Sequence, residues 1–200
     1  MSIAPLKLAA CALLGVVLAQ SWLPIGAGFA GAAIIVAAAW RQRVRWQHEM
    51  AAPEAAERAA LLSIAGTVVC LGYFLAMLVQ IGPELDVHAR LTRKMANELW
   101  ILIAASVVAQ WIAQAPQGTR DELDASIAAR ALSASCWVLL GLQAALLVWF
   151  GLGLDAGDPL RSIDVLLHLF IGSWMAAQVF HVLFCAHAYA TLRLEAGKVA

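Results

Sequence analysis

The last apolar stretch of the chain, residues 163–190, carries more side chains that can titrate or bind a metal than any other. They are Asp164, His168, Gln178, His181 and Cys185. At about 100° per residue on a helix, these side chains fall within an arc of about 140° centred near Gln178. Because polar groups that face lipid are costly, the sequence predicts that this face points into a helix bundle.

Two pairs among these residues suggest a bound cofactor or metal. His168 and His181 lie 13 residues apart, about 20 Å along a helix, a spacing like that of haem ligands in some membrane cytochromes. Haem ligation would need partner histidines in other spans, whereas His48 and His88 fall in polar connections. His181 and Cys185 lie one turn apart, but two ligands are too few for a metal site. We therefore expect no cofactor and no metal.

Two further interpretations involve polar side chains of several spans. In one, Gln110, Gln143, Gln178 and His181 form a polar or proton-conducting path through the bundle. In the other, which we favour, they form hydrogen bonds between helices, each worth about 0.6 kcal/mol. The sequence contains no glycine-rich phosphate loop, no H-E-x-x-H, no G-x-S-x-G and no carboxylate pair at membrane depth. We therefore expect that the protein is not an enzyme.

The composition identifies the solvent in which these residues must act. Of the 200 residues, 63% are hydrophobic and 13% are charged, against about 45–50% and about 25% in soluble domains. The apolar residues come in blocks long enough to cross a hydrocarbon core about 30 Å thick. In lipid, backbone polar groups must pair within their own segment, and the blocks lack the alternation of barrel strands. We predict an all-α, polytopic membrane helical bundle. The formal net charge of zero does not favour a nucleic-acid partner.

Glycine, proline and charged residues divide the chain into six predicted transmembrane helices, arranged as three hairpins at residues 3–40, 53–115 and 119–190. The predicted spans are residues 3–23, 25–40, 59–81, 99–115, 131–154 and 163–190. We treat residues 1–200 as one integral membrane domain. The sequence Val17-Leu18-Ala19 also resembles a signal-peptidase site, but we expect the first span to remain as an uncut anchor.

Several segments carry patterns that predict helix packing. In the second span, Ala27 and Gly31, and Gly28 and Ala32, are four residues apart, a spacing that lets two helix backbones approach closely. The third span has a stripe at helical spacing that predicts a packing face: Ser63, Thr67, Cys70, Phe74 and Met77. Residues 84–98 form an amphipathic pattern, which predicts a helix that lies on the membrane surface or extends the fourth span.

Lysine and arginine residues favour one orientation, because they are enriched in cytoplasmic loops. With the N-terminus in the cytoplasm, the cytoplasmic side carries Lys7, Arg41, Arg43, Arg45, Arg58, Arg120, Arg130, Arg193 and Lys198. The outer side carries Arg90, Arg93, Lys94 and Arg161. We therefore predict a multi-pass protein of the cell (inner) membrane with both termini in the cytoplasm.

An acidic segment precedes the fifth span and predicts a helix that continues into it without a break. Its notable residues are Asp121, Glu122, Asp124, Ile127 and Arg130, followed by Trp137. This pattern resembles a family of small uncharacterised prokaryotic multi-pass membrane proteins, in which an Asp-Glu-Arg-Asp-like segment precedes a two-helix hairpin. Leu123 stands where the family usually has arginine. The resemblance covers about residues 119–190 and implies a helical hairpin but no activity. A few identities also align the hairpins at 53–115 and 119–190, as an internal repeat would.

The charged cytoplasmic segments form the predicted recognition surface. It comprises Arg41, Arg43 and Arg45 after the second span, and Asp121, Glu122 and Asp124 before the fifth. We predict an interaction or scaffold-type membrane protein that binds a protein partner or a second copy of itself. One alternative is that these charges pair with one another or face water. Another is that the arginines contact anionic lipid headgroups, at about 1 kcal/mol per charge. A third is a small transporter or channel with a polar path along residues 163–190.

Overall fold

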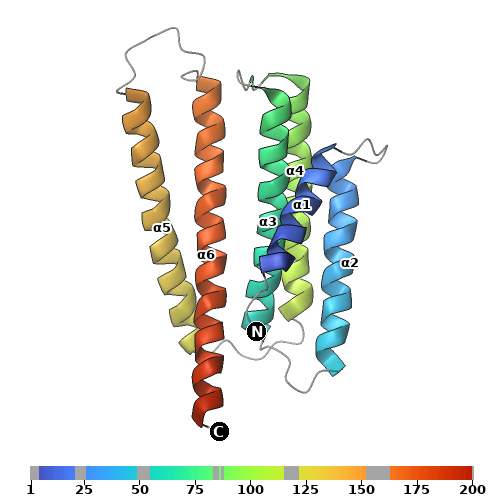
Figure 1. Ribbon diagram of the computed structural model, residues 1–200, viewed down its shortest axis with the longest axis vertical. Coiled ribbons are helices and arrows are strands. Elements are labelled where there is room, and N and C mark those ends of the chain that lie inside the picture. Colours follow the sequence, from blue (N-terminus) through green and yellow to red (C-terminus); the bar gives the residue numbers. More distant parts are fainter. Residues whose placement is uncertain are drawn as a thin grey trace.

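The computed structural model describes residues 5–20, 26–48, 55–82, 86, 88–114, 122–151 and 163–199, and all regular secondary structure in them is α-helical (Figure 1). The helices are α1 (Pro5–Gln20), α2 (Ala27–His48), α3 (Ala55–Ile81), α4 (Arg90–Gln114), α5 (Glu122–Gly151) and α6 (Ile163–Val199). The prediction of an all-helical fold is confirmed, and so is the unbroken helix from the acidic segment into the fifth span.

The helices form a four-helix body with a hairpin attached to one side. Successive helices run in opposite directions, so α1 starts and α6 ends toward the same end of the molecule (Figure 1). In the body, α3 and α4 pack side by side, α1 packs on α3, and α2 packs on α4. The contact between α1 and α2 is much smaller. In the hairpin, α5 packs on α6, and α6 joins the body through α3.

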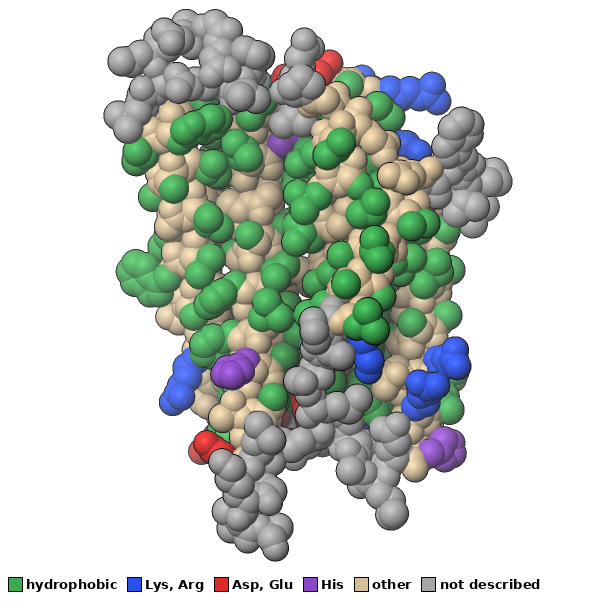
Figure 2. Space-filling model, in the orientation of Figure 1, with side chains coloured by type: hydrophobic (Ala, Val, Ile, Leu, Met, Phe, Trp, Pro, Cys, Tyr) green, Lys and Arg blue, Asp and Glu red, His purple; other side chains and the backbone are tan. Residues whose placement is uncertain are grey.

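Four of the described helices, α3 to α6, are long and apolar enough to cross a membrane. The described part of α1 has 16 residues, about 24 Å of helix, and the apolar part of α2 ends at Trp40, about 21 Å from its start. Both fall short of a hydrocarbon core of about 30 Å. On the face shown in Figure 2, charged side chains gather near the upper and lower ends, and hydrophobic side chains cover the middle. These features are those of a helical membrane protein.

Two helix boundaries differ from the prediction, and a third decides between two predicted alternatives. α2 continues past Trp40 to His48, because residues 41–48 include arginine and glutamine, which favour helix, and contain no glycine or proline. α4 begins at Arg90, so the amphipathic segment extends the fourth span rather than lying apart from it. α6 runs on to Val199, through residues predicted to be a polar tail. In each of these helices, charged residues lie outside the apolar stretch but still within the helix.

The backbones of α1 and α3 touch at two glycines. A β-carbon on Gly15 would overlap the carbonyl oxygen of Val69, and a β-carbon on Gly72 would overlap that of Ala12. Any larger residue at either position would push the two helices apart. Such close approach maximises van der Waals contact, which drives helix association in lipid where the hydrophobic effect between helices is absent. This contact was not predicted from the sequence.

The second close contact joins α2 to α4. A β-carbon on Gly28 would lie 2.9 Å from the α-carbon of Glu98, and one on Gly31 would lie 2.5 Å from Leu102 and 2.7 Å from Leu18. The predicted close packing of the second span is therefore confirmed. The glycines let the start of α2 rest directly on the backbone of α4.

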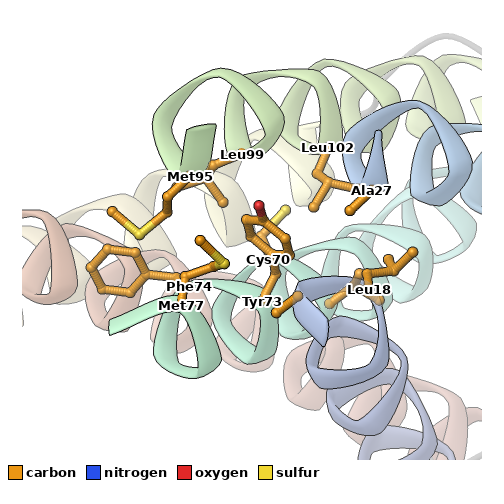
Figure 3. Close-up of a cluster of buried hydrophobic side chains, with 11 residues drawn as sticks. Leu18, Ala27, Cys70, Tyr73, Phe74, Met77, Met95, Leu99 and Leu102 are labelled. Atoms are coloured by element: carbon orange, nitrogen blue, oxygen red, sulfur yellow. The ribbon is translucent and has the colours of Figure 1, made fainter. Parts of the chain in front are cut away.

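A cluster of buried side chains fills the body where α1 to α4 meet (Figure 3). It consists of Leu18, Ala19, Ala27, Val69, Cys70, Tyr73, Phe74, Met77, Met95, Leu99 and Leu102. In Figure 3, Tyr73 and Cys70 lie between the Phe74, Met77 and Met95 side chains and the Leu18, Ala27 and Leu102 side chains. The predicted packing face of the third span is confirmed, with only Thr67 of its five residues half-buried.

The contact at Gly72 yields a test with a matched control. We expect Gly72→Ala to destabilise the protein by about 1–3 kcal/mol, because its β-carbon overlaps the Ala12 backbone. Gly141→Ala also replaces a helical glycine, but its β-carbon meets nothing within 4 Å, so stability should stay equal or rise by up to about 1 kcal/mol. Thermal unfolding in detergent measures both variants. Equal losses for the two variants would contradict the backbone contact.

Candidate functional site

A buried tyrosine–glutamate pair lies between α3 and α4. The Tyr73 hydroxyl donates a hydrogen bond of 2.6 Å to Glu98 Oε2. Tyr73 is fully buried and Glu98 is 8% exposed. Glu98 lies within the segment of α4, Arg90–Ala113, that is apolar enough to cross a membrane. An ionisable group at such a position is costly to bury and marks a candidate functional site.

The start of α2 reaches the same carboxyl group. A β-carbon on Gly26 would lie 3.4 Å from Glu98 Oε1, and the φ angle of Gly26 is +81°, which glycine adopts without strain. The first amides of a helix have no carbonyl acceptor within the helix, and this end carries a partial positive charge. Oε2 of Glu98 therefore accepts the Tyr73 hydrogen bond, and Oε1 lies near the partial positive charge at the start of α2.

The end of α1 is matched by a polar side chain of α3. Gln80 Nε2 donates a hydrogen bond of 3.2 Å to the carbonyl oxygen of Ala19, one of the last four carbonyls of α1, which lack donors within the helix. The upper ends of α1 and α2 stop below those of α3 and α4 (Figure 1). The two shorter helices thus end against polar side chains of the longer pair.

Glu98 was not among the residues predicted from the sequence, although a signal was present. The amphipathic pattern of residues 84–98 placed Met95 and Leu99 on its apolar side, and both are buried, as is Leu102. Glu98 comes three residues after Met95 and four before Leu102, which puts it on the same side of the helix. An acid on the apolar side of an amphipathic helix was the observation that could have found the site.

The predicted polar face of α6 does not point into the bundle as a whole. His168 is only 2% exposed, and its Nδ1 lies 2.7 Å from the carbonyl oxygen of Asp164. In contrast, Gln178 at the centre of the predicted face is exposed, and Trp174 is 66% exposed. The buried side of α6 also includes Val165, Ser173, Ala177 and Val182. The prediction was wrong for Gln178 because packing of small and apolar side chains, rather than hydrogen bonding, orients this helix.

The other candidates along the predicted polar path are not brought together. His181 Nε2 lies 3.9 Å from Cys185 Sγ, and both side chains are half-buried. Gln110 and Gln143 are half-buried on α4 and α5, two helices without an extended contact. The part of the chain that the structure describes holds no group of three or more His, Cys, Asp or Glu side chains able to bind a metal.

The two described acids of the predicted recognition surface differ in their surroundings: one forms a hydrogen bond between helices, and the other is exposed. Asp124 Oδ1 accepts a hydrogen bond of 2.8 Å from the Tyr189 hydroxyl, which ties the start of α5 to α6. Glu122 is exposed. Asp121 lies outside the described residues. Glu122 is therefore the described acid of this surface that is most accessible to a partner.

The basic part of this surface lies at the lower end of α2, at the same end of the molecule as the start of α5 (Figure 1). Arg41 and Arg45 are exposed, and Arg43 is half-buried. The Arg43 guanidinium lies 5.7 Å from the centre of the Trp40 ring, within the range of a cation–π interaction. An exposed tryptophan followed by arginines is typical of a helix that passes from lipid into the headgroup region.

The buried pair links α3 to α4 and lies beside the start of α2. Searches against protein-family models, curated proteins and solved structures found no match. The family resemblance of residues 119–190 stays a prediction.

Two tyrosine–carboxylate hydrogen bonds of different burial allow a direct comparison. We expect Tyr73→Phe to destabilise the protein by about 1.5–3 kcal/mol, because Glu98 is buried and loses a donor. We expect Tyr189→Phe to cost about 0.6–1 kcal/mol, because its partner Asp124 is only partly buried and stays hydrated. Unfolding in detergent measures both. If Tyr189→Phe lost more stability than Tyr73→Phe, Glu98 would not be the carboxylate that is costlier to leave without its tyrosine donor.

Proposed function

We propose that the protein is a non-enzymatic integral membrane protein that binds a helix of a partner membrane protein along α6. The observation that carries this proposal is the exposed side chain of Gln178. It lies near the centre of the segment Ile163–Leu192, which is apolar enough to cross a membrane. A polar side chain that faces lipid at this depth is costly, and hydrogen bonds to a partner helix offset that cost.

Unequal packing supports the same proposal. In the most apolar 18-residue stretch of α3, half of the stretch is buried within the molecule. The buried share of the corresponding stretch is 11% in α5 and 17% in α6. The outer face of α5 also exposes Ser133 and Cys136, small side chains that allow close helix approach. More of the apolar surface of α3 and α4 is therefore buried within the molecule than that of α5 and α6, which keep broad faces available.

The proposed orientation places six membrane-inserted helices, in three hairpins, in the cell membrane with both termini in the cytoplasm. The distribution of lysine and arginine supports it. So do the alternating helix directions, which bring the start of α1 and the end of α6 to one end of the molecule (Figure 1). In this orientation Glu122, Arg41 and Arg45 face the cytoplasm, where they are available to the polar segments of the partner or to anionic headgroups.

A transporter or channel with a path along α6 is less well supported. Such a path needs its polar side chains to face one enclosed space. Gln178 is exposed, and Gln110 and Gln143 lie on helices without an extended contact. These positions favour a surface for binding over a path for conduction.

The orientation is tested by reporter fusions. We expect a reporter fused after Ala200 to score as cytoplasmic, because the basic residues flank the cytoplasmic ends of the helices. A reporter inserted in the segment 83–87 should score as external. An external result for the fusion after Ala200 would overturn the orientation, whatever the partner of α6.

The partner surface is tested by photo-crosslinking in intact membranes. A photo-reactive amino acid in place of Trp174 should give a protein adduct of defined mass, because residue 174 lies one turn from Gln178 on an exposed face. The change Gln178→Leu should lower the adduct yield about threefold or more, the effect of losing one interhelical hydrogen bond.

Val79 on α3 is the matched control position, because it is 84% exposed on a helix that belongs to the body. A probe at Val79 should react mainly with lipid. The adduct mass shows whether the partner is a second copy of the 21.3 kDa chain or another protein. Lipid adducts alone at residue 174, or the same protein adduct from residue 79, would overturn the proposal.

A further inference from the structure

The Glu98 carboxyl group joins three helices through its two oxygens. Oε2 accepts the hydrogen bond from Tyr73 on α3. Oε1 faces the start of α2, where a β-carbon on Gly26 would lie 3.4 Å away, and Gly28 rests against the Glu98 backbone. The residue is 8% exposed. Its charge state therefore affects how the start of α2 sits on α4.

Few other ionisable groups face this carboxyl group in the described part of the chain. On α3 they are Tyr73 and, one turn earlier, Cys70, which is also buried. At the start of α2, Gly26, Ala27 and Gly28 have no side chain that titrates. On α4 itself, Lys94 is one turn away and exposed. The ionised carboxylate is thus held mainly by a hydroxyl and by the positive end of a helix.

The two charge states of Glu98 interact differently with the start of α2. The ionised group accepts the Tyr73 hydrogen bond at Oε2, and its negative charge attracts the partial positive charge at the helix start, which lies near Oε1. When a proton from water adds to Oε1, the group becomes neutral and this attraction is lost. Protonation therefore weakens the contact between Glu98 and the start of α2.

We propose that Glu98 is an intramembrane proton-binding site whose ionised form holds the start of α2 against α4. Proton uptake changes no bond except the new O–H bond on the carboxyl group. It loosens the contact between α2 and α4 while Tyr73 stays bonded to Oε2. The site is separate from the proposed partner surface on α6, so either can fail without the other.

The first measurement is pH-difference infrared spectroscopy of the full chain in lipid nanodiscs, between about pH 4 and about pH 9, a range that spans the titration of carboxyl groups in varied surroundings. We expect a band of protonated carboxyl stretching at low pH that is absent in Glu98→Gln. Glu57→Gln is the control, because Glu57 is also a buried acid but lies on α3 near the opposite end of the body. It should keep the Glu98 band.

The second measurement uses cysteines of the chain at one fixed pH. Glu98→Gln imitates the neutral form, so the body should open more often, and Cys70, which is 4% exposed, should react at least about threefold faster with a membrane-permeant maleimide. Cys136 is exposed on α5 and should react at an unchanged rate. An unchanged ratio of Cys70 to Cys136 labelling would overturn the proposal.

A third variant covers the case in which Glu98→Gln does not fold. Tyr73→Phe keeps the carboxyl group but removes the hydrogen bond to Oε2, so the carboxyl band should move to higher wavenumber. Absence of a titrating carboxyl band, or a band that stays in place in Tyr73→Phe and in Glu98→Gln, would assign the proton to another group and refute the site.

Discussion

Helix ends that lie inside a bilayer need hydrogen-bond partners, and this constraint organises the four-helix body. Water cannot satisfy the free amides and carbonyls there, so the protein must supply partners. α1 and α2 are shorter than α3 and α4 in apolar length, and their upper ends stop within the body. Gln80 bonds to the last turn of α1, and Glu98 faces the first residues of α2. Burial of Glu98 costs free energy, and so does a helix start without hydrogen-bond partners. Placing the acid beside the start of α2 offsets part of both costs.

Glycines also allow the closest helix contacts of this four-helix body. The α1–α3 contact depends on Gly15 and Gly72, and the α2–α4 contact depends on Gly28 and Gly31. These positions bring backbones together and leave the side chains of the core cluster to fill the centre. Both the body and the α5–α6 hairpin expose large apolar side chains, such as Trp100 and Trp174. The hairpin differs in that much less of its apolar surface is buried within the molecule.

The fold class, the six helices and the packing role of the second and third spans could be predicted, because each depends on local composition and spacing. The α1–α3 contact was missed, although Gly15 and Ala19, and Gly72 and Ala76, have the same four-residue spacing of small residues. Glu98 was missed because a charged residue in an amphipathic segment is ordinarily placed on its polar side. The orientation of α6 was wrong at Gln178, because it depends on which faces of α3 and α5 it meets. Helix identity is encoded locally, whereas the facing of side chains is decided by neighbours distant in sequence.

The first two helices form a hairpin in the order of the chain but not in their packing. Each lies mainly on a helix of the next pair, α1 on α3 and α2 on α4, with little contact between them. Before α3 and α4 enter the membrane, the glycine faces of α1 and α2 have no partner backbone, and the first amides of α2 have no Glu98 to face. The two helices that are synthesised first therefore cannot reach their packed positions until α3 and α4 have been made.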